Sequence, residues 1–317
     1  MKSRMHQRGV AVITALLLTT LAITIVASLF WQQQVQVRSI ENQRLQLQKQ
    51  WVLRGALDYA KLILKEDAEH SRVDHLGEPW AVPLADTRLD QYVDNGRADV
   101  DTSDASLSGS ITDAQARYNL SNLCVNGAVN PRELAAFQRL LVNLRINPEL
   151  AQVTANAMLE TQRKPIDPNH PVPIETPPVG PRQTPILRVE DLLAVPGFST
   201  EIINKLRDYL IVLPRPTPIN INTAPVEVIA AKVDTLSVAD AASLVSSRER
   251  AYFLDNSDVT QRIPGKPLNL STEDVAVTTS YFLVNGKVRL NRASLQIQAL
   301  IERNVGAKPK IIWIREE

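Results

Sequence analysis

The sequence predicts an α+β protein with one long N-terminal helix, a helical middle part and an antiparallel, β-rich end. Residues 10–31 form an apolar run without charge, and apolar side chains continue at helical spacing to about residue 69. Residues 131–161 and 186–245 repeat that helical spacing. Residues 275–315 alternate apolar and polar side chains, as half-buried strands do. These patterns predict a membrane-associated helix followed by globular parts of both kinds.

The composition allows one or two globular units. The chain has 317 residues, 44% of them hydrophobic, which is ample for a packed core. Its formal net charge is +1, and basic residues concentrate ahead of the apolar run, so the rest of the chain is nearly neutral. Nucleic-acid binding needs a basic surface, so we expect no nucleic-acid partner. Cys124 is the single cysteine, which excludes an intramolecular disulfide and predicts a buried thiol.

The N-terminal stretch has three interpretations, of which a cleaved secretory signal is the first. Lys2, Arg4 and Arg8 precede an uncharged run from Val10 to Trp31. As a helix of about 22 residues it would span roughly 33 Å, enough to cross a bilayer. The run is too long for a secretory signal and lacks a clear cleavage site. A plain signal anchor, with the basic flank inside and the bulk of the chain outside, fits the stretch best when it is considered alone.

A prepilin-like leader is the third interpretation. Such leaders are short and basic, end in glycine and are cut just before an apolar run. Gln7-Arg8-Gly9 followed by Val10 has this arrangement. Prepilin-like proteins usually carry glutamate at the fifth mature position, and Thr14 stands there in this chain. Within this stretch, Thr14 therefore argues against the interpretation.

The helical spacing predicts one helix from about Val10 to about Glu69. At about 60 residues it would be roughly 90 Å long, which is rare in a soluble globular protein. We therefore expect one face to pack on the C-terminal part and the rest to join a bundle with other chains. The turn-rich segment 77–84 should close the helix, with Trp80 as a packing anchor. Residues 105–115 alternate and predict a strand.

The helical middle contains two segments that look like helix-hairpin-helix units. Residues 131–161 predict two amphipathic helices, and residues 163–185 hold eight prolines and predict an extended loop. Residues 186–206 place a Pro196-Gly197 turn between two short helices, and residues 222–245 form a weaker copy without the glycine.

Hairpins of this kind can bind DNA phosphates through exposed amides, so a membrane-anchored DNA-uptake protein is the alternative function. Phosphate binding needs a basic surface. Around the intact hairpin, Lys205 and Arg207 are offset by Glu201 and Asp208. The pattern therefore favours a helical domain that simply packs.

Candidate metal or catalytic residues are few. Asp255, Asn256 and Asp258 offer oxygen atoms that Ca²⁺ prefers, but they also suit an Asx turn that caps a helix, which is favoured. The acidic segment 94–104 does not match the spacing of an EF-hand, so we expect a solvated loop. The sequence contains no GxSxG or HExxH motif, and its four histidines form no catalytic arrangement. We therefore expect no enzyme.

Three strands are predicted at the C-terminal end. They cover residues 275–284, 286–303 and 310–315. Asn285-Gly286 is a favoured two-residue hairpin turn, so we expect the first two strands to reverse there. Residues 304–307 make the next connection, and the strand that precedes Cys124 can join the same antiparallel sheet.

The order of these segments resembles the K-type minor pseudopilins of bacterial type II secretion systems. The resemblance runs over nearly the whole chain, and K-type pseudopilins also lack the glutamate that Thr14 replaces. The matching segments are Glu78-Pro79-Trp80-Ala81 and residues 113–123, 192–198, 219–224 and 281–313.

The resemblance implies a pilin-like fold in which the long helix packs on an antiparallel sheet and a large all-α domain is inserted between strands. The implied parts are a leader (1–9), a transmembrane helix (10–31), a first pilin-like part (32–127), the inserted domain (128–274) and a second pilin-like part (275–317). Calcium binding in the inserted domain is also implied, with Asp255, Asn256 and Asp258 as the candidate ligands.

The resemblance further implies processing and assembly. A prepilin peptidase would cut between Gly9 and Val10, and Val10 would be N-methylated. The chain would cross the bacterial inner membrane once, with its C-terminal part in the periplasm. It would assemble through the inner-membrane platform with the minor pseudopilins I, J and H at the pseudopilus tip, where it would cap or initiate the structure that drives protein export.

Overall fold

The computed structural model describes residues 8–88, 105–162, 185–263, 270–290, 293–304 and 306–316. Most of the predicted leader, the acidic segment 94–104 and nearly all of the proline-rich run lie outside these ranges.

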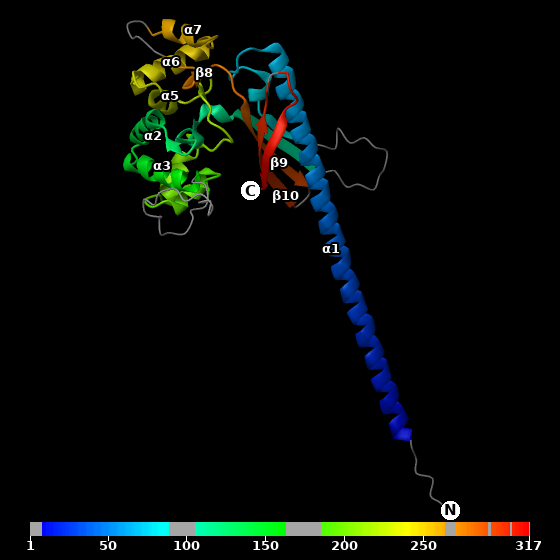
Figure 1. The fold of residues 1–317 in the computed structure, drawn as a ribbon. Helices are drawn as coiled ribbons and strands as arrows, with labels where there is room; N and C mark the ends of the chain where they lie inside the picture. Colours follow the sequence, from blue (N-terminus) through cyan, green and yellow to red (C-terminus); the bar gives the residue numbers. More distant parts are fainter. Residues whose placement is uncertain are drawn as a thin grey trace, which may run out of the picture.

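The long N-terminal helix is confirmed. Helix α1 runs without a break from Arg8 to His70 and projects far below the rest of the molecule (Figure 1). Its distal part is buried at spacings of three and four residues, through Leu53, Leu57, Ala60 and Leu64. The chain then turns through a 3₁₀ segment, Pro79–Ala81, where Trp80 is 1% exposed and packs edge-on against Phe282. Trp80 is thus the predicted packing anchor.

Five antiparallel strands form the main sheet, in the order β1-β2-β9-β10-β11. The strands are β1 (Leu84–Arg88), β2 (Ala105–Asp113), β9 (Tyr281–Leu290), β10 (Ala293–Glu302) and β11 (Lys310–Glu316). As predicted, the strand that precedes Cys124 joins the C-terminal strands, because β2 pairs with β9. Two segments far apart in the sequence therefore share one sheet.

The predicted hairpin turn at Asn285-Gly286 is wrong. Both residues lie in the middle of β9, and Gly286 pairs with Gly109 of β2 and with Ile297 of β10. A Cβ atom on Gly109 would come within 2.8 Å of the Asn285 carbonyl oxygen, and one on Gly286 would meet Leu53 of α1 at 3.4 Å. Gly109 therefore serves close packing inside the sheet, whereas a Cβ atom on Gly286 would make an ordinary contact, and β9 continues to Leu290, which pairs with Ala293 of β10.

The segment between β2 and β9, which we call the insert, is mainly helical. Its helices are α2 (Pro131–Asn143), α3 (Glu149–Gln162), η4 (Val189–Ala194), α4 (Thr200–Leu206), α5 (Val226–Lys232), α6 (Val238–Arg250) and α7 (Asn256–Gln261). Short strand pairs also occur in its described parts: β3 (Tyr118–Asn119) with β6 (Leu210–Ile211), β4 (Cys124–Val125) with β5 (Ala128–Val129), and β7 (Ile219–Asn220) with β8 (Val275–Ala276). The insert is therefore not purely helical.

The insert has its own hydrophobic core, which starts earlier in the chain than residue 128. Tyr118 and Leu123 are fully buried there together with Phe137, and Cys124 is buried as predicted. The first predicted hairpin is formed by η4 and α4, and Gly197 between them has a positive φ of 94°. A Cβ atom at Gly197 would come within 2.6 Å of Leu150, so glycine is required both for the turn and for packing on α3.

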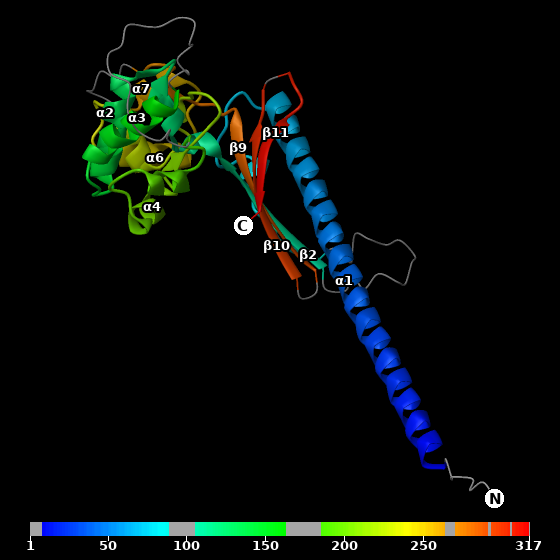
Figure 2. The same cartoon turned by 60° about the horizontal axis from the view of Figure 1, so that its bottom comes forward.

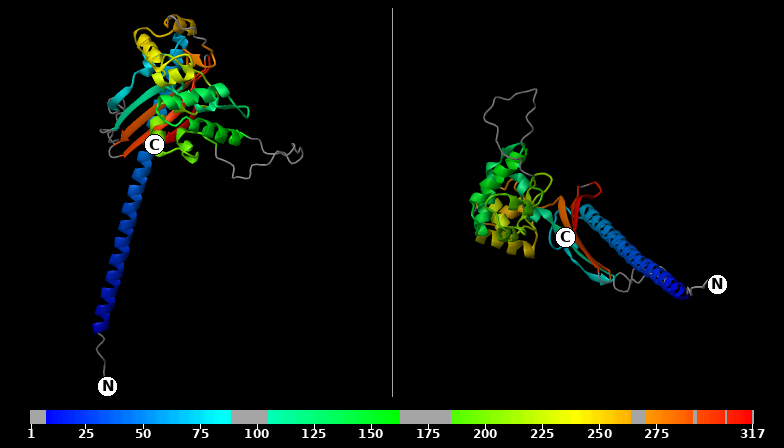
Figure 3. Two further views of the ribbon diagram at one scale, coloured as in Figure 1. Left: turned by 90° about the vertical axis from the view of Figure 1, so that its left-hand side faces the viewer. Right: turned by 90° about the horizontal axis from the view of Figure 1, so that it is seen from below.

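The sheet lies between α1 and the insert, as Figures 2 and 3 show from different sides. Alternate residues of the same strands face the two neighbours. Phe282 and Val284 of β9 pack with α1, whereas Tyr281 and Leu283 pack with Ile211 of the insert. The two bodies are therefore joined through both faces of one sheet.

Candidate functional site

The proximal part of α1 is an apolar rod that the described residues leave exposed. The large apolar side chains from Val12 to Trp31 are all more than half exposed. Among the described residues, the helix spanning Ala11–His70 is the one long and apolar enough to cross a membrane, and none of its most apolar window is buried. Exposed apolar surface on this scale marks a segment whose normal surroundings are lipid or other protein.

The predicted processing site lies at the start of this rod. Gly9 and Val10 belong to the first turn of α1. Thr14 follows one turn later, and its hydroxyl donates to the carbonyl oxygen of Ala11 at 3.0 Å. The fifth position after the predicted cut therefore carries a neutral side chain that bonds within its own helix.

A second apolar stripe runs along α1 above the membrane-length segment. Ile40, Leu47, Trp51 and Leu62 are all more than half exposed, and Trp51 is 68% exposed. They are spaced by seven, four and eleven residues, so they lie along one face of the helix. Leu53, which packs on the sheet, follows Trp51 by two residues, or roughly 200° around the helix. The stripe therefore faces away from the sheet and is available to another chain.

A buried polar network joins the insert to the sheet. The side-chain amide of Asn220 donates to Asp113 Oδ2 at 2.8 Å and to the Asp74 carbonyl oxygen at 3.0 Å. The Thr223 hydroxyl donates to the same Asp113 oxygen at 2.6 Å. Burial raises the pKa of Asp113, and the hydrogen bonds from Thr223 and Asn220 oppose that rise. The segment 219–224, which carried part of the family resemblance, thus fastens the insert in place.

A buried arginine fastens the distal end of α1 to the sheet. Arg303 follows β10, and its Nη1 donates to Asp67 Oδ2 at 2.6 Å while its Nη2 donates to Asp74. Its guanidinium lies 4.6 Å from the centre of the Phe282 ring, and Asp74 also accepts from the Thr279 amide at 2.7 Å. Burial raises the pKa of Asp74 to about 7, against the lowering effect of Arg303. Such buried charges keep their structure only when they are paired.

Sequence reasoning missed both of these networks. Asp67, Asp74 and Arg303 are ordinary charged residues in the sequence, and their partners are far away along the chain. The one local signal was a polar asparagine between isoleucines at Asn220, since a strand that buries such a residue needs partners for it.

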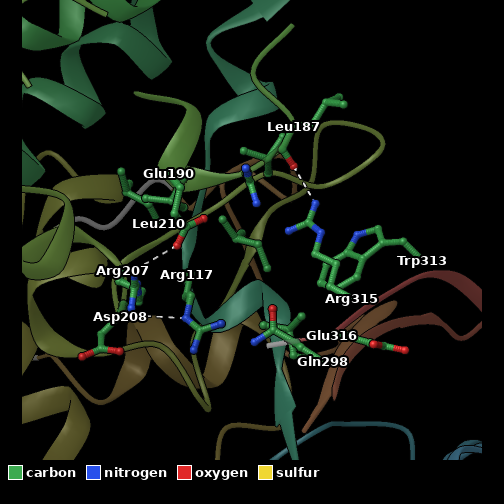
Figure 4. Close-up of a pocket in the computed structure, with 15 residues that line it drawn as sticks. Arg117, Leu187, Glu190, Arg207, Asp208, Leu210, Gln298, Trp313, Arg315 and Glu316 are labelled. Atoms are coloured by element: carbon green, nitrogen blue, oxygen red, sulfur yellow. Dashed lines mark hydrogen bonds and ion pairs between the residues drawn. The ribbon is translucent and has the colours of Figure 1, made fainter. Parts of the chain in front are cut away.

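A cleft of about 560 Å³ separates part of the insert from β11 (Figure 4). Arg117 donates to the Asp208 carbonyl oxygen at 3.3 Å, and Arg315 donates to the Leu187 carbonyl oxygen at 3.1 Å (Figure 4). The Arg315 guanidinium also stacks 4.0 Å from the centre of the Trp313 ring. Burial lowers the pKa of both arginines. The Arg315 contact crosses from the sheet to the insert and adds to its attachment, whereas the Arg117 contact lies within the insert.

The three predicted calcium ligands take part in capping and fastening α7. Asp255 is the N-cap, and its Oδ1 accepts from the Asp258 amide at 2.8 Å. Asp258 forms a 2.6 Å ion pair with Arg262, which lowers the pKa of Asp258. Asn256 donates to the Val275 carbonyl oxygen at 3.1 Å. These contacts match the capping interpretation, and calcium binding here stays a prediction.

The basic residues of the first hairpin are ion-paired. Lys205 lies 3.2 Å from Glu201, as its position one turn away predicts. Arg207 pairs with Glu190 of η4 at 3.2 Å, instead of with the neighbouring Asp208. The positive charges of the hairpin are therefore balanced by acids on the same unit.

Comparisons with known proteins agree on one family. Two family models described as "Type II secretion system (T2SS), protein K" match residues 116–215 and 219–280, just over half of the chain together. Type II secretion system protein K of Pseudomonas aeruginosa is 28% identical over 98% of this chain and 92% of the relative. Its counterpart from Aeromonas hydrophila is 23% identical over 99% of this chain and 98% of the relative.

The fold has also been observed in a solved structure. A chain in the crystal structure of the GspK-GspI-GspJ complex from enterotoxigenic Escherichia coli superposes with a TM-score of 0.68. The match covers 88% of this chain and 99% of that chain at 20% sequence identity, so it shows a shared fold.

Proposed function

Because this chain belongs to the type II secretion system protein K family, we propose that it is a minor pseudopilin that caps, and helps to initiate, the periplasmic pseudopilus. Its role is structural and not enzymatic: it takes part in the assembly that exports proteins through the outer membrane.

The exposed proximal part of α1 is the observation that carries this proposal. An apolar helix of this length is stable in a bilayer before assembly and in a bundle of apolar helices afterwards. The insert supports the terminal position, because it stands beside the sheet on the side opposite α1 and widens the subunit greatly (Figure 2). A shaft built from repeated copies of so wide a subunit would bring the inserts into collision.

Thr14 supports the same position on electrostatic grounds. In a pilin-like filament, glutamate at the fifth mature position neutralises the N-terminal amine of a neighbouring subunit. A subunit without that carboxylate leaves such an amine unpaired in an apolar core, and a buried unpaired charge is costly. Thr14 bonds within its own helix and offers no charge. The cost disappears when the subunit is the topmost one.

We place the minor pseudopilins I and J, and also H, as its neighbours. A chain of the same fold was crystallised in a complex with GspI and GspJ. The exposed stripe Ile40, Leu47, Trp51 and Leu62 is the surface on α1 that fits such a neighbour, since it faces away from the sheet. The prepilin peptidase would cut between Gly9 and Val10, Val10 would be N-methylated, and the inner-membrane platform would receive the product with its C-terminal part in the periplasm.

The position is tested by labelling the subunit with gold-coupled antibody on sheared pseudopili. We expect label at one end of each pseudopilus, and label along the shaft would overturn the capping role. Mass spectrometry of the mature N-terminus tests the processing, where a methylated Val10 is expected. In a secretion assay, Thr14→Glu should disturb tip placement or export, and an unchanged result would remove the charge argument.

A further inference from the structure

Three acidic side chains converge where α1 ends and the following loop turns. Asp67, Asp74 and Glu78 each bring one carboxylate oxygen within 4.8 Å of the others. Their side chains are 5%, 3% and 6% exposed. The group lies in the pilin-like body and involves none of the candidate calcium ligands of the insert.

The group carries more negative charge than its neighbours balance. Among the described residues, Arg303 is the permanent cation in ion-pair contact with it. His75 Nε2 lies 3.9 Å from Glu78, too far for a hydrogen bond. When ionised, the three carboxyl groups carry three negative charges against the single positive charge of Arg303. Burial raises the pKa values of Asp67 and Asp74, and the charge of Asp113 adds to the rise at Asp74, as expected at a site short of positive charge.

One carboxylate oxygen of Glu78 is buried without a hydrogen-bond partner among the described residues, which indicates a bound ligand. Its Oε2 accepts from the His75 amide at 3.0 Å and from the Trp80 indole N–H at 2.7 Å. Its Oε1 is buried and accepts no hydrogen bond from any residue that the structure describes. A buried carboxylate oxygen without a partner is rare, because it has given up water without compensation. The Glu78 carboxylate, which belongs to the group with Asp67 and Asp74, is held in place by the two hydrogen bonds to its Oε2.

We propose that Asp67, Asp74 and Glu78 bind a divalent cation of the size of Ca²⁺. The ligands are all oxygens, which excludes the soft metals that prefer sulfur or imidazole. The three oxygens lie within 4.8 Å of one another, which permits one cation between them, and Ca²⁺ accepts carboxylate oxygens in flexible geometry whereas Mg²⁺ demands a near-ideal octahedron. A charge of +2 brings three ionised carboxylates and one guanidinium to neutrality, and Arg303 keeps its ion pairs with Asp67 and Asp74.

The bound cation would tie the last turn of α1 to the loop that carries Trp80. Asp67 belongs to α1, whereas Asp74 and Glu78 belong to the loop. Through Arg303, the same carboxylates reach the end of β10. The cation would therefore stabilise the corner where the rod, the loop and the sheet meet. This inference stands on the geometry of the corner and holds whether or not the subunit caps the pseudopilus.

Terbium luminescence tests the site. The Trp80 indole donates a hydrogen bond to Glu78, so it lies close enough to transfer excitation energy to a Tb³⁺ ion bound there. Full-length protein in detergent micelles, freed of calcium with a chelator, is titrated with Tb³⁺ under excitation of tryptophan. We expect saturable emission that Ca²⁺ displaces at lower concentration than Mg²⁺. Glu78→Gln should weaken Tb³⁺ and Ca²⁺ binding at least about tenfold.

The paired variant Asp255→Asn/Asp258→Asn is the matched control, since it removes the candidate ligands of the insert and should leave the emission unchanged. Asp67→Asn, which alters the ligand on α1, should also weaken calcium binding measured by calorimetry, which covers the case that Glu78→Gln does not fold. If the folded protein showed neither Tb³⁺ emission nor a heat of Ca²⁺ binding, the proposal would be overturned, and the carboxylates would be neutralised by protons instead. Emission that is lost in the paired variant, or calcium binding that is unchanged in folded Glu78→Gln and Asp67→Asn, would place the cation elsewhere and overturn it as well.

Discussion

The two halves of α1 share one unbroken helix and differ in what stabilises them. From Val12 to Trp31 the large apolar side chains are exposed, and no part of the described protein covers them. From Leu53 to Leu64 the buried side chains pack on the sheet, and Arg303 ties the helix end to β10. The distal half is thus part of the folded domain, whereas the proximal half exposes apolar surface that lipid or another protein chain can cover. Under the proposed function, one helix would therefore carry the subunit from the membrane into the pseudopilus without refolding.

The comparison predicts that substitutions at the contact between the distal half of α1 and the sheet destabilise the domain. The largest effect should come from Arg303→Met, on the sheet side of that contact. The change leaves Asp67 and Asp74 buried without their cation, which should cost about 3–5 kcal/mol of the free energy of unfolding. Denaturant unfolding of the detergent-solubilised chain measures it. Arg289→Met, which breaks an exposed 3.9 Å pair with Asp86, is the control and should cost less than about 1 kcal/mol. Equal costs would mean that the Arg303 pairs add nothing.

Leu64→Ala tests the apolar side of the same contact. Leu64 is completely buried under the sheet, so truncation should cost about 2–5 kcal/mol in the same unfolding experiment. Leu62→Ala is matched in chemistry and lies two residues away on the opposite face of the helix at 51% exposure, so its effect should stay within about 0.5 kcal/mol. If Leu62→Ala proved as costly as Leu64→Ala, the two faces of α1 would not differ as described.

Trp51→Ala should separate assembly from stability. Trp51 is exposed on the free stripe, so the free energy of unfolding should change by less than about 0.5 kcal/mol. If Trp51 anchors a neighbouring subunit, its loss should weaken association with the I and J pseudopilins by about 2 kcal/mol, close to thirtyfold. Pull-down of the co-expressed subunits measures this. Wild-type association of the variant would show that the stripe is not the contact surface.

The smallest effect is expected in the insert, away from α1. Asp255→Ala removes the N-cap of α7 and should cost about 1 kcal/mol. Hydrogen exchange should show faster opening of α7 and unchanged protection of α1 residues 53–64. Loss of protection in α1 would mean that the insert and the pilin-like body unfold as one unit.

Local patterns accounted for most elements, and the exceptions are informative. The helix α1, the strand 105–113, the two helices within 131–162 and the cap at Asp255 all follow from signals a few residues long. Asn285-Gly286 shows the limit of such signals. Its turn propensity is real, but both residues pair with Ser110 and Gly109 of β2, and a local rule cannot include a partner strand so far away in the sequence.

The sequence alone determined which parts of the chain are rod, helix and strand, because apolar spacing along the chain reports directly on local geometry. It also predicted the family, which the comparisons bear out. The tertiary structure decided which charges are buried together. Asp67, Asp74, Glu78 and Arg303 become one group only when the end of α1 meets the end of β10, since burial and pairing depend on distance in space and not on separation in sequence.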